Sequence, residues 1–424
     1  MKSPYPICLI QGFSGVGKST LYSSIYQIAP TRTLCLATTG IAALNLMEYG
    51  VPFVSTIHSA FSLKPVEMYI YREQDYLKHK AMLDCIDTIL IDESSMLDCS
   101  LMDWLLSLVG ESGKHGHDIR IILFGDILQL PPVIKKSPRI AQIWENVYGA
   151  SAFFFNARRF DRENTQIYML TKVYRQKDKK LSDALTSLRE TPAPIESIQY
   201  LNRRVCTQEE FRNQLGETFL TVVSTNKEKN EINEMAISVL NSKEPRGFTY
   251  KTTFDGIVDD SALATIPPKI TLYNGEKIMC TANTDDYKNG TLGTIIGFSE
   301  KEQLPIARLS SGKETTIQYH LVNCYIPIIG GDGLLDYQLV GTASQIAAVP
   351  AYACTIHKTQ GLTLDAVYYK ISDRWTPPSG TYVALSRCKT LDGIGLSRPL
   401  KQSDIMYSKE AWDFYQRIMK ASEY

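Results

Sequence analysis

The first third of the chain alternates short apolar runs with longer segments of mixed polarity. Apolar, β-branched runs bounded by polar residues occur at 7–11, 33–37, 86–91 and 119–124, and such runs predict strands. Residues 20–28 have helical spacing and follow a glycine-rich turn. Continuously apolar strands that alternate with helices are typical of a parallel sheet covered on both faces. The pattern therefore predicts a doubly wound α/β domain over residues 1–165.

The second part of the chain, 166–424, has a different texture. A buried strand is predicted at 219–224, α/β patterning at 346–400, and a closing amphipathic helix at 409–420. Between them, residues 271–345 contain short β patterns separated by glycine turns at Asn289-Gly290, Gly330-Gly331 and Gly333. Asn-Gly between apolar runs is a strong hairpin signal. We predict a small β-rich insertion at roughly 298–345.

Composition excludes several classes of protein. The 424 residues suggest two or three domains. Apolar residues make up 44% and charged residues 21%, which is ordinary globular composition. Lys plus Arg and Asp plus Glu each number 45, so a uniformly basic nucleic-acid binder and an acidic tail are excluded. Local basic channels remain possible, because net charge conceals patterning.

Membrane spans, disulfides and metal clusters are not predicted. No run of about 18 apolar residues occurs, and the apolar run at 7–10 is too short for a signal peptide. The nine cysteines have irregular spacing without Cys-x-x-Cys, which favours free thiols in a reducing compartment. His115 and His117 lie in a polar, glycine-containing stretch, for which a solvated loop is the favoured interpretation over a metal site.

A phosphate-binding loop follows the first predicted strand. Gly12 to Ser19, GFSGVGKS, matches G-x-x-x-x-G-K-[ST] and precedes a helical pattern. Glycines let backbone N–H groups surround phosphates, and the helix N-terminus favours negative charge. Lys18 is positioned by this motif to reach the β- and γ-phosphates, and the Ser19 hydroxyl to bind Mg²⁺.

Two further predicted strands end in polar residues that suit the same phosphate and Mg²⁺ chemistry. The strand 89–91 ends in Asp92 and Glu93; Asp92 suits a magnesium anchor, and Glu93 is placed to polarise an attacking water. Gly125 to Pro132 (GDILQLPP) follows a third strand, and its Gln129 suits a γ-phosphate sensor. Taken alone, each segment is equally consistent with a solvated strand end or a proline-stiffened loop.

The order of these segments resembles one family. The chain is similar to the superfamily-one DNA helicases of 5′-to-3′ polarity, specifically the Pif-type helicases near the RecD and Dda branch. The resemblance spans nearly the whole chain and rests on Gly12–Ser19, Thr38–Ala43, Thr56–Phe61, Asp92–Met96, Gly125–Val133, Tyr174–Gln176, Thr225–Asn226, Lys288–Gly293, Thr355–Asp365 and Tyr382–Arg387. It implies two RecA-like P-loop domains in tandem, with a small wedge insertion near 62–85 in the first and a small β-barrel-like insertion in the second.

The resemblance also implies a set of site residues. The catalytic set is Lys18, Asp92, Glu93, Gln129, Arg175 and Arg387, with Ser19 and Asp92 on the metal. The nucleotide set is Gly12, Gly15, Val16, Gly17, Lys18, Ser19, Thr20, Gln360 and Gly361. The DNA set is Thr39, Gly40, Thr56, His58, Phe61, Thr225, Asn226, His357 and Lys358. Core packing is the alternative for His58 and Phe61.

The implied activity is ATP- and Mg²⁺-dependent unwinding of single-stranded and tailed duplex DNA, with family roles in replication, repair, recombination and telomere maintenance. A monomer is expected, cytoplasmic in a bacterial or viral source and nuclear or mitochondrial in a eukaryote. A single-strand translocase, an RNA helicase and a nucleotide-dependent switch without strand separation are the alternatives. The family's Gln-containing adenine segment has no counterpart ahead of Ile7, so adenine recognition has no assigned residue.

Two stretches of opposite sign reconcile the zero net charge with a DNA partner. Residues 157–189 hold nine Lys or Arg against four Asp or Glu, whereas residues 81–103 hold six acids and no Lys or Arg. A motor that releases its strand at every step has reason to confine positive charge to a channel.

Overall fold

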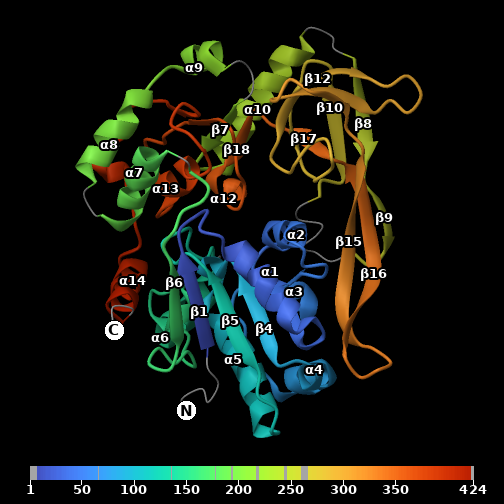
Figure 1. Cartoon of the computed structure of the whole chain (residues 1–424), viewed down its shortest axis with the longest axis vertical. Coiled ribbons are helices and arrows are strands. Elements are labelled where there is room, and N and C mark those ends of the chain that lie inside the picture. The colour runs from blue at the N-terminus through green and yellow to red at the C-terminus, as the bar shows by residue number, and fades with distance from the viewer. Residues whose placement is uncertain are drawn as a thin grey trace.

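The structure is a computed structural model of the chain. It describes residues 7–64, 66–134, 136–176, 178–191, 194–215, 219–242, 246–258 and 266–421. The strands form two parallel sheets and a separate β-rich region (Figure 1).

The first core is a six-stranded parallel sheet of order β3-β2-β4-β5-β1-β6. Its strands are β1 (Ile7–Gly12), β2 (Thr33–Ala37), β3 (Ser55–Thr56), β4 (Thr88–Asp92), β5 (Arg120–Gly125) and β6 (Gln166–Leu170). The helices and 3-10 turns are α1 (Lys18–Ile28), η1 (Pro30–Arg32), α2 (Gly40–Glu48), α3 (Ile57–Ala60), α4 (Glu73–Cys85), η2 (Ser94–Met96), α5 (Cys99–Lys114), α6 (Pro138–Tyr148) and η3 (Phe154–Asn156). The central strands are buried along almost their whole length, because helices cover both faces of the sheet.

The second core is a four-stranded parallel sheet of order β18-β7-β19-β20. Its strands are β7 (Leu220–Val223), β18 (Ala353–Thr355), β19 (Val367–Tyr369) and β20 (Ile394–Leu396). The surrounding helices and 3-10 turns are α7 (Lys179–Glu190), α8 (Ile195–Leu201), η4 (Asn202–Arg204), α9 (Gln208–Leu215), α10 (Asn226–Asn241), α12 (Ile356–Thr359), α13 (Gly380–Leu385), η5 (Gln402–Asp404) and α14 (Lys409–Ala421).

The β-rich region is inserted between β7 and β18. It contains β8 (Gly247–Lys251), β9 (Thr253–Gly256), β10 (Lys269–Tyr273), β11 (Lys277–Cys280), β12 (Leu292–Phe298), β13 (Pro305–Leu309), β14 (Glu314–Thr316), β15 (Tyr319–Ile329), β16 (Leu335–Ile346) and β17 (Ala348–Pro350). The five-stranded and two-stranded antiparallel sheets share one apolar core, which gives this region its barrel-like character. The long β15–β16 hairpin pairs with β9 in a third sheet.

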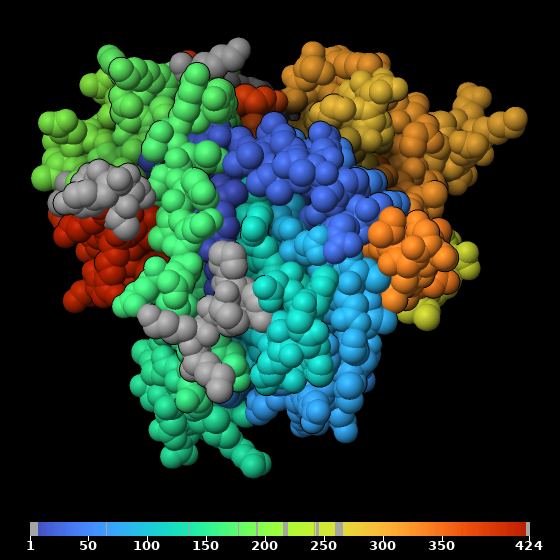
Figure 2. Space-filling model, turned by 60° about the horizontal axis from the view of Figure 1, so that its bottom comes forward, coloured from blue at the N-terminus to red at the C-terminus, as the bar shows by residue number. Residues whose placement is uncertain are grey.

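Two elements far along the chain pack onto the first core. The hairpin brings Tyr337 against Phe53, with ring centroids 4.7 Å apart. On another side, α14 stacks Phe414 on Phe155 at 4.1 Å. Figure 2 shows both, with the hairpin in orange and α14 in red beside the blue-to-green first core. The second half of the chain therefore packs against the first core at two separate places.

The structure differs from the predicted boundaries in two places. Strand β6 pairs with β1 in the first sheet, so that sheet extends past residue 165. The antiparallel strands begin at Gly247 and end at Pro350, so the insertion is about twice as long as the 298–345 predicted. The first core and the closing helix agree closely with the predicted elements.

The predicted wedge segment is mostly packed against the first core. Helix α4 lies on α5, and Tyr76 is buried with its ring stacked on His115 at 5.3 Å. Tyr76 is therefore a core-packing residue. The described helices include none long and apolar enough to cross a membrane. All nine cysteines lie in the described part of the chain, and each is a thiol outside any disulfide. His117 contacts the backbone oxygen of Ile86 at 2.6 Å.

Candidate active site

The phosphate-binding loop joins β1 to α1. Gly15 and Gly17 have φ values of 82° and 87°, in the left-handed region that glycine adopts without a Cβ penalty. A Cβ on Gly15 would lie 2.4 Å from the Cβ of Arg175, so glycine is also needed for close approach. The Lys18 ammonium donates to the carbonyl oxygens of Gly12 and Phe13 at 2.9 Å each. Burial lowers the pKa of Lys18, and nearby carboxylates partly oppose that shift.

Two carboxylates stand at the carboxyl end of β4. Asp92 is its last residue, and Glu93 follows in a left-handed conformation with φ of 53°. Such a conformation in a residue other than glycine is strained, and strain of this kind clusters at functional sites. Burial, followed by the charge of Glu93, raises the pKa of Asp92 to about 7.

The buried carboxylate of Asp92 and the Ser19 hydroxyl line the same cavity. A desolvated carboxylate beside a hydroxyl is well suited to a divalent cation, so this donor set fits Mg²⁺. The ion would neutralise phosphate charge when bound with nucleotide.

Two arginines point at the phosphate loop from the other side. Arg387 is 1% exposed, and its guanidinium donates to Ser14 Oγ at 3.0 Å and to the Val383 carbonyl oxygen at 2.9 Å. Arg175 also donates to Ser14 Oγ, at 2.5 Å. Burial, reinforced by the charge of Arg175, lowers the pKa of Arg387 to about 10.

Arg175 lies on the connector between the two cores. The Tyr174 amide donates to the Gly15 carbonyl oxygen at 2.8 Å. Two residues later, the Gln176 side-chain amide donates to the carbonyl oxygens of Ser386 and Cys388 at 3.1 and 3.2 Å. The connector is thus tied to the phosphate loop at one end and to the segment carrying Arg387 at the other. The sequence placed Arg175 in the second domain, and the structure places it at the junction.

One cavity of about 380 Å³ between the cores collects most of the predicted site. All six residues predicted to be catalytic line it: Lys18, Asp92, Glu93, Gln129, Arg175 and Arg387. Gly15, Gly17, Ser19, Thr20, Gln360 and Gly361 of the predicted nucleotide set line it as well. Gly12 and Val16 do not; Gly12 ends β1 and Val16 is buried beneath the loop. The volume is in the range of small-molecule sites.

Two glutamines contact acidic residues around the cavity. The Gln360 amide donates to Glu93 Oε2 at 3.1 Å, and the Gln129 amide donates to Asp126 Oδ2 at 3.2 Å. Gln360 therefore links the second core to the carboxylate predicted to activate water.

Several lining residues were missed from the sequence. Asn45, Glu48 and Tyr49 come from the end of α2, Asn289 from the β-rich region, and Ser14 from the phosphate loop. Ser14 and Asn289 lie inside recognised motifs, Gly12–Ser19 and Lys288–Gly293, which gave no reason to select them for the nucleotide site. Asn45, Glu48 and Tyr49 lie outside every motif, so only tertiary packing identifies them.

The predicted DNA residues follow the carboxyl ends of strands in both cores. Thr39 and Thr225 follow β2 and β7, and Thr56 is the last residue of β3. Each of the three side chains accepts an amide hydrogen bond at the start of the next helix. Gly40 is the first residue of α2 and Asn226 the first of α10, whereas His357 and Lys358 lie on α12 after β18. Thr39, His357 and Lys358 also line the nucleotide cavity, so they stand between the two predicted sites.

His58 and Phe61 have different environments. His58 Nε2 lies 2.5 Å from the Tyr69 hydroxyl, and its ring is half-buried. Phe61 is fully buried, packed edge-on against His79 and Trp104 at 5.2 and 5.3 Å. No face of the Phe61 ring is available to a base, so the prediction that it contacts DNA is corrected to a core-packing role.

A buried ion pair near the cavity was also missed. Arg189 on α7 and Asp126, which follows β5, are both fully buried, and Arg189 Nη2 lies 2.6 Å from Asp126 Oδ1. The guanidinium lies 4.5 Å from the Phe13 ring centroid and 4.7 Å from that of Tyr415. This contact, which we call the interdomain seam (Phe13, Asp126, Arg189 and Tyr415), joins the phosphate loop, the second core and α14.

A phosphate loop and two carboxylates on one parallel core face Arg387 of the second core and Arg175 of the connector. This arrangement is that of a P-loop nucleotide site between two RecA-like domains. Comparison with known proteins agrees. A family model described as an AAA domain matches residues 1–135. The chain is 24% identical to "ATP-dependent DNA helicase PIF1" of Emericella nidulans, covering 97% of this chain and 61% of that protein. It is 28% identical to human PIF1, covering 90% and 57%, and 27% identical to Pif1 of Bdellovibrio bacteriovorus, covering 91% and 83%.

Solved structures support the same fold. Bacteroides sp. Pif1 in complex with ADP-AlF4 superposes with a TM-score of 0.81 at 23% identity, covering 99% of this chain and 94% of that one. Pif1 helicase from Candida albicans gives a TM-score of 0.66 at 22% identity, covering 98% and 96%. The chain is thus similar in sequence to Pif1 helicases and shares the fold of their solved structures. It spans about three fifths of the fungal and human relatives.

Proposed function

We propose that this protein is an ATP-dependent DNA helicase that moves 5′ to 3′ along single-stranded DNA and unwinds duplex DNA. The observation that carries the proposal is the convergence of Lys18, Asp92, Glu93, Arg175 and Arg387 on one cavity between two RecA-like cores. A site made from both cores couples hydrolysis to relative movement of the cores, which is what a translocating motor requires. The relatives are named ATP-dependent DNA helicases, and Bacteroides Pif1 has been solved bound to single-stranded DNA. The 5′-to-3′ direction rests on the family resemblance.

The chemistry divides between the two sides of the cavity. Lys18 and the phosphate-loop amides hold the β- and γ-phosphates, and Ser19 with Asp92 would hold Mg²⁺, which would neutralise phosphate charge. Glu93 accepts a proton from the attacking water, with Gln360 positioning its carboxylate. Arg175 and Arg387 stabilise the charge on the γ-phosphoryl oxygens as the bond to the leaving group lengthens.

The predicted DNA residues, without Phe61, form the strand-binding edge. Thr39, Gly40, Thr56 and His58 act from the first core, and Thr225, Asn226, His357 and Lys358 from the second. Because one chain supplies both sides of the cavity, we propose that the monomer is active. The protein acts in the compartment that holds its DNA, which is the cytoplasm in a bacterial or viral source and the nucleus or mitochondrion in a eukaryote.

The decisive experiment compares unwinding of 5′-tailed and 3′-tailed DNA duplexes with ATP and Mg²⁺. We expect product strands from the 5′-tailed substrate only, and none with Lys18→Ala, because the ammonium that binds the β- and γ-phosphates is lost. Thermal unfolding of Lys18→Ala provides the control for folding. Equal unwinding of both substrates would contradict the direction. Unwinding of RNA but not DNA would favour the RNA helicase, and hydrolysis without product strands would favour the translocase.

A further inference from the structure

The loop after β19 continues the row of predicted DNA residues on the second core. Thr225 and Asn226 follow β7, and His357 and Lys358 follow β18. Strand β7 lies between β18 and β19, and all three are parallel. The carboxyl ends of parallel strands meet at one edge of the sheet, where ligands of such folds bind. The loop 370–379 is therefore the next segment along that edge.

This loop contacts the residue that precedes the predicted DNA residues after β7. The hydroxyls of Thr376 and Ser224 lie 3.3 Å apart, and both residues are buried. Ser224 is the residue immediately before Thr225. The loop thus lies against the end of β7.

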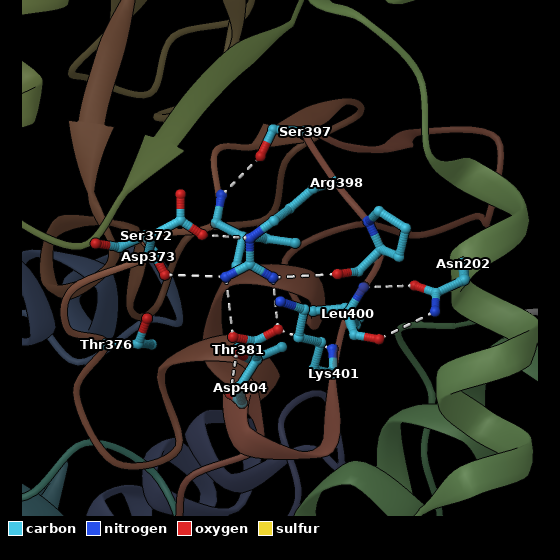
Figure 3. A network of polar contacts seen from close by, with 12 residues as sticks. Asn202, Ser372, Asp373, Thr376, Thr381, Ser397, Arg398, Leu400, Lys401 and Asp404 are labelled. Atoms are coloured by element: carbon cyan, nitrogen blue, oxygen red, sulfur yellow. Dashed lines mark hydrogen bonds and ion pairs between the residues drawn. The ribbon is translucent and has the colours of Figure 1, made fainter.

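A polar network holds the loop in one conformation (Figure 3). The Arg398 guanidinium donates to Asp373 Oδ1 at 2.8 Å, to the Ser372 carbonyl oxygen at 3.1 Å, and to both carboxylate oxygens of Asp404 at 2.7 and 3.0 Å. The Ile371 amide donates to Ser397 Oγ at 3.0 Å. Pro377 and Pro378 restrict the backbone further.

The rigid loop displays an aromatic ring and a positive charge. Trp375 is 50% exposed, although its large apolar surface favours burial. Arg374 beside it is exposed and forms no ion pair within the described part of the chain. Lys227, Lys358 and Lys370 are also exposed near these strand ends, whereas the acidic Asp373 is engaged by Arg398. The exposed Arg374 and Lys370 therefore offer positive charge to an anion at this edge.

We propose that Trp375 and Arg374 form a stacking platform for single-stranded DNA, with the indole against a base and the guanidinium on a neighbouring phosphate. Such pairing of aromatic rings with positive charge is how proteins bind single strands without sequence preference. Because the network already fixes the loop, little conformational freedom is lost when a base stacks on it. This proposal rests on the proposed function. It places the single strand over the loop after β19, next to the end of β7.

The native tryptophan reports on this platform directly. The chain has four tryptophans; Trp104 and Trp144 are buried, and Trp412 is half-buried beside Tyr415 at 6.2 Å. The wild-type protein is titrated with oligodeoxythymidylate while intrinsic fluorescence is recorded. The expected result is quenching that saturates with binding and is absent in Trp375→Phe.

Affinity is measured separately by the anisotropy of a dye-labelled oligodeoxythymidylate. Trp375→Ala is expected to weaken binding roughly 10- to 100-fold, and Trp375→Phe to retain most of the affinity. Arg374→Ala is expected to reduce the slope of log affinity against log salt concentration by about 0.7. Tyr168→Ala is the matched control, because Tyr168 is 56% exposed on β6 at the far edge of the first sheet.

The two proposals fail in different ways. If the wild-type protein does not bind the labelled strand, the proposed function is contradicted. If it binds while the Trp375-dependent fluorescence is unchanged, the platform is overturned and the helicase proposal stands. An equal loss of affinity in Trp375→Ala and Tyr168→Ala would also overturn it.

Discussion

Two arginines buried close to the phosphate loop have opposite surroundings. Arg387 is 1% exposed and forms no ion pair among the described residues; its donors reach hydroxyl and carbonyl oxygens. Arg189, fully buried, binds Asp126 with two of its nitrogens. Burial lowers the pKa of Arg387 to about 10, whereas Asp126 raises the pKa of Arg189 above its usual value against the opposing effect of burial.

This difference separates a functional charge from a structural one. Burying a cation without a carboxylate partner destabilises the folded protein unless a bound anion neutralises the charge. The cavity beside Arg387 is lined by the phosphate-loop residues Gly15, Gly17 and Lys18, so an anion held by that loop would be this partner. Arg189 already has its anion and holds the cores together at the interdomain seam. The comparison predicts that removing either arginine damages the protein in a different way.

The largest expected effect is on hydrolysis in Arg387→Met. The substitution removes the charge that meets the γ-phosphoryl group, so DNA-stimulated ATP turnover should fall by about 10³- to 10⁵-fold. Thermal unfolding should show an unchanged or higher Tm, because an unpaired buried charge is removed. Turnover within tenfold of wild type would show that Arg387 is a structural residue like Arg189.

The next largest expected effect is the loss of ATP turnover in Glu93→Gln, which tests a catalytic residue that the first core supplies. The amide keeps the shape of the side chain but cannot accept the proton of the attacking water, so turnover should fall by about 10²- to 10⁴-fold. Binding of a fluorescent ATP analogue should persist, because Lys18 and the loop amides are untouched. Loss of binding together with turnover would assign Glu93 to nucleotide binding instead.

A substitution in the interdomain seam should change the free energy of unfolding. Arg189→Met leaves Asp126 buried and unpaired, so urea unfolding should give a free energy lower by about 3–5 kcal/mol. Combining it with Asp126→Asn should recover much of that loss, because both charges of the pair are then gone. If the two substitutions were simply additive, the pair would not be the structural element described here.

The smallest expected effect is a pH dependence from Asp92. Its folded-state pKa is raised to about 7 by burial and by Glu93, above the value of about 4 in an unfolded chain. The folded state therefore holds this proton more tightly, and stability falls as pH rises from about 4 to 7, then levels off. The Tm of the nucleotide-free protein should fall by a few degrees across that range, and Asp92→Asn should flatten the change. A Tm that rises through the same window in wild type but not in Asp92→Asn would reverse the assignment.

Local patterns were enough to predict the first core. Its strands and the phosphate loop depend on apolar runs and on glycine spacing, both of which operate within a few residues. The edge strand β6 (QIYML) was not predicted, although four of its five residues are apolar.

Long-range packing explains the remaining differences. Phe61 lies in a motif that suggested DNA contact, but its ring is enclosed by His79 and Trp104. Asp126 and Arg189 are 63 residues apart, and no local pattern joins them. The hairpin and α14 reach the first core from the far end of the chain, so their contacts follow from the path of the backbone.

The sequence by itself determined the strand-and-helix order of the first core, the phosphate loop and the two carboxylates, because each depends on residue type and close spacing. The two arginines that meet Ser14 were identified through the family resemblance. Only the tertiary structure decided which buried charges pair with an opposite charge inside the protein and which are left to pair with a charged ligand. That distinction depends on burial and on partners brought from distant segments, and desolvation in the folded state sets its energetic consequences.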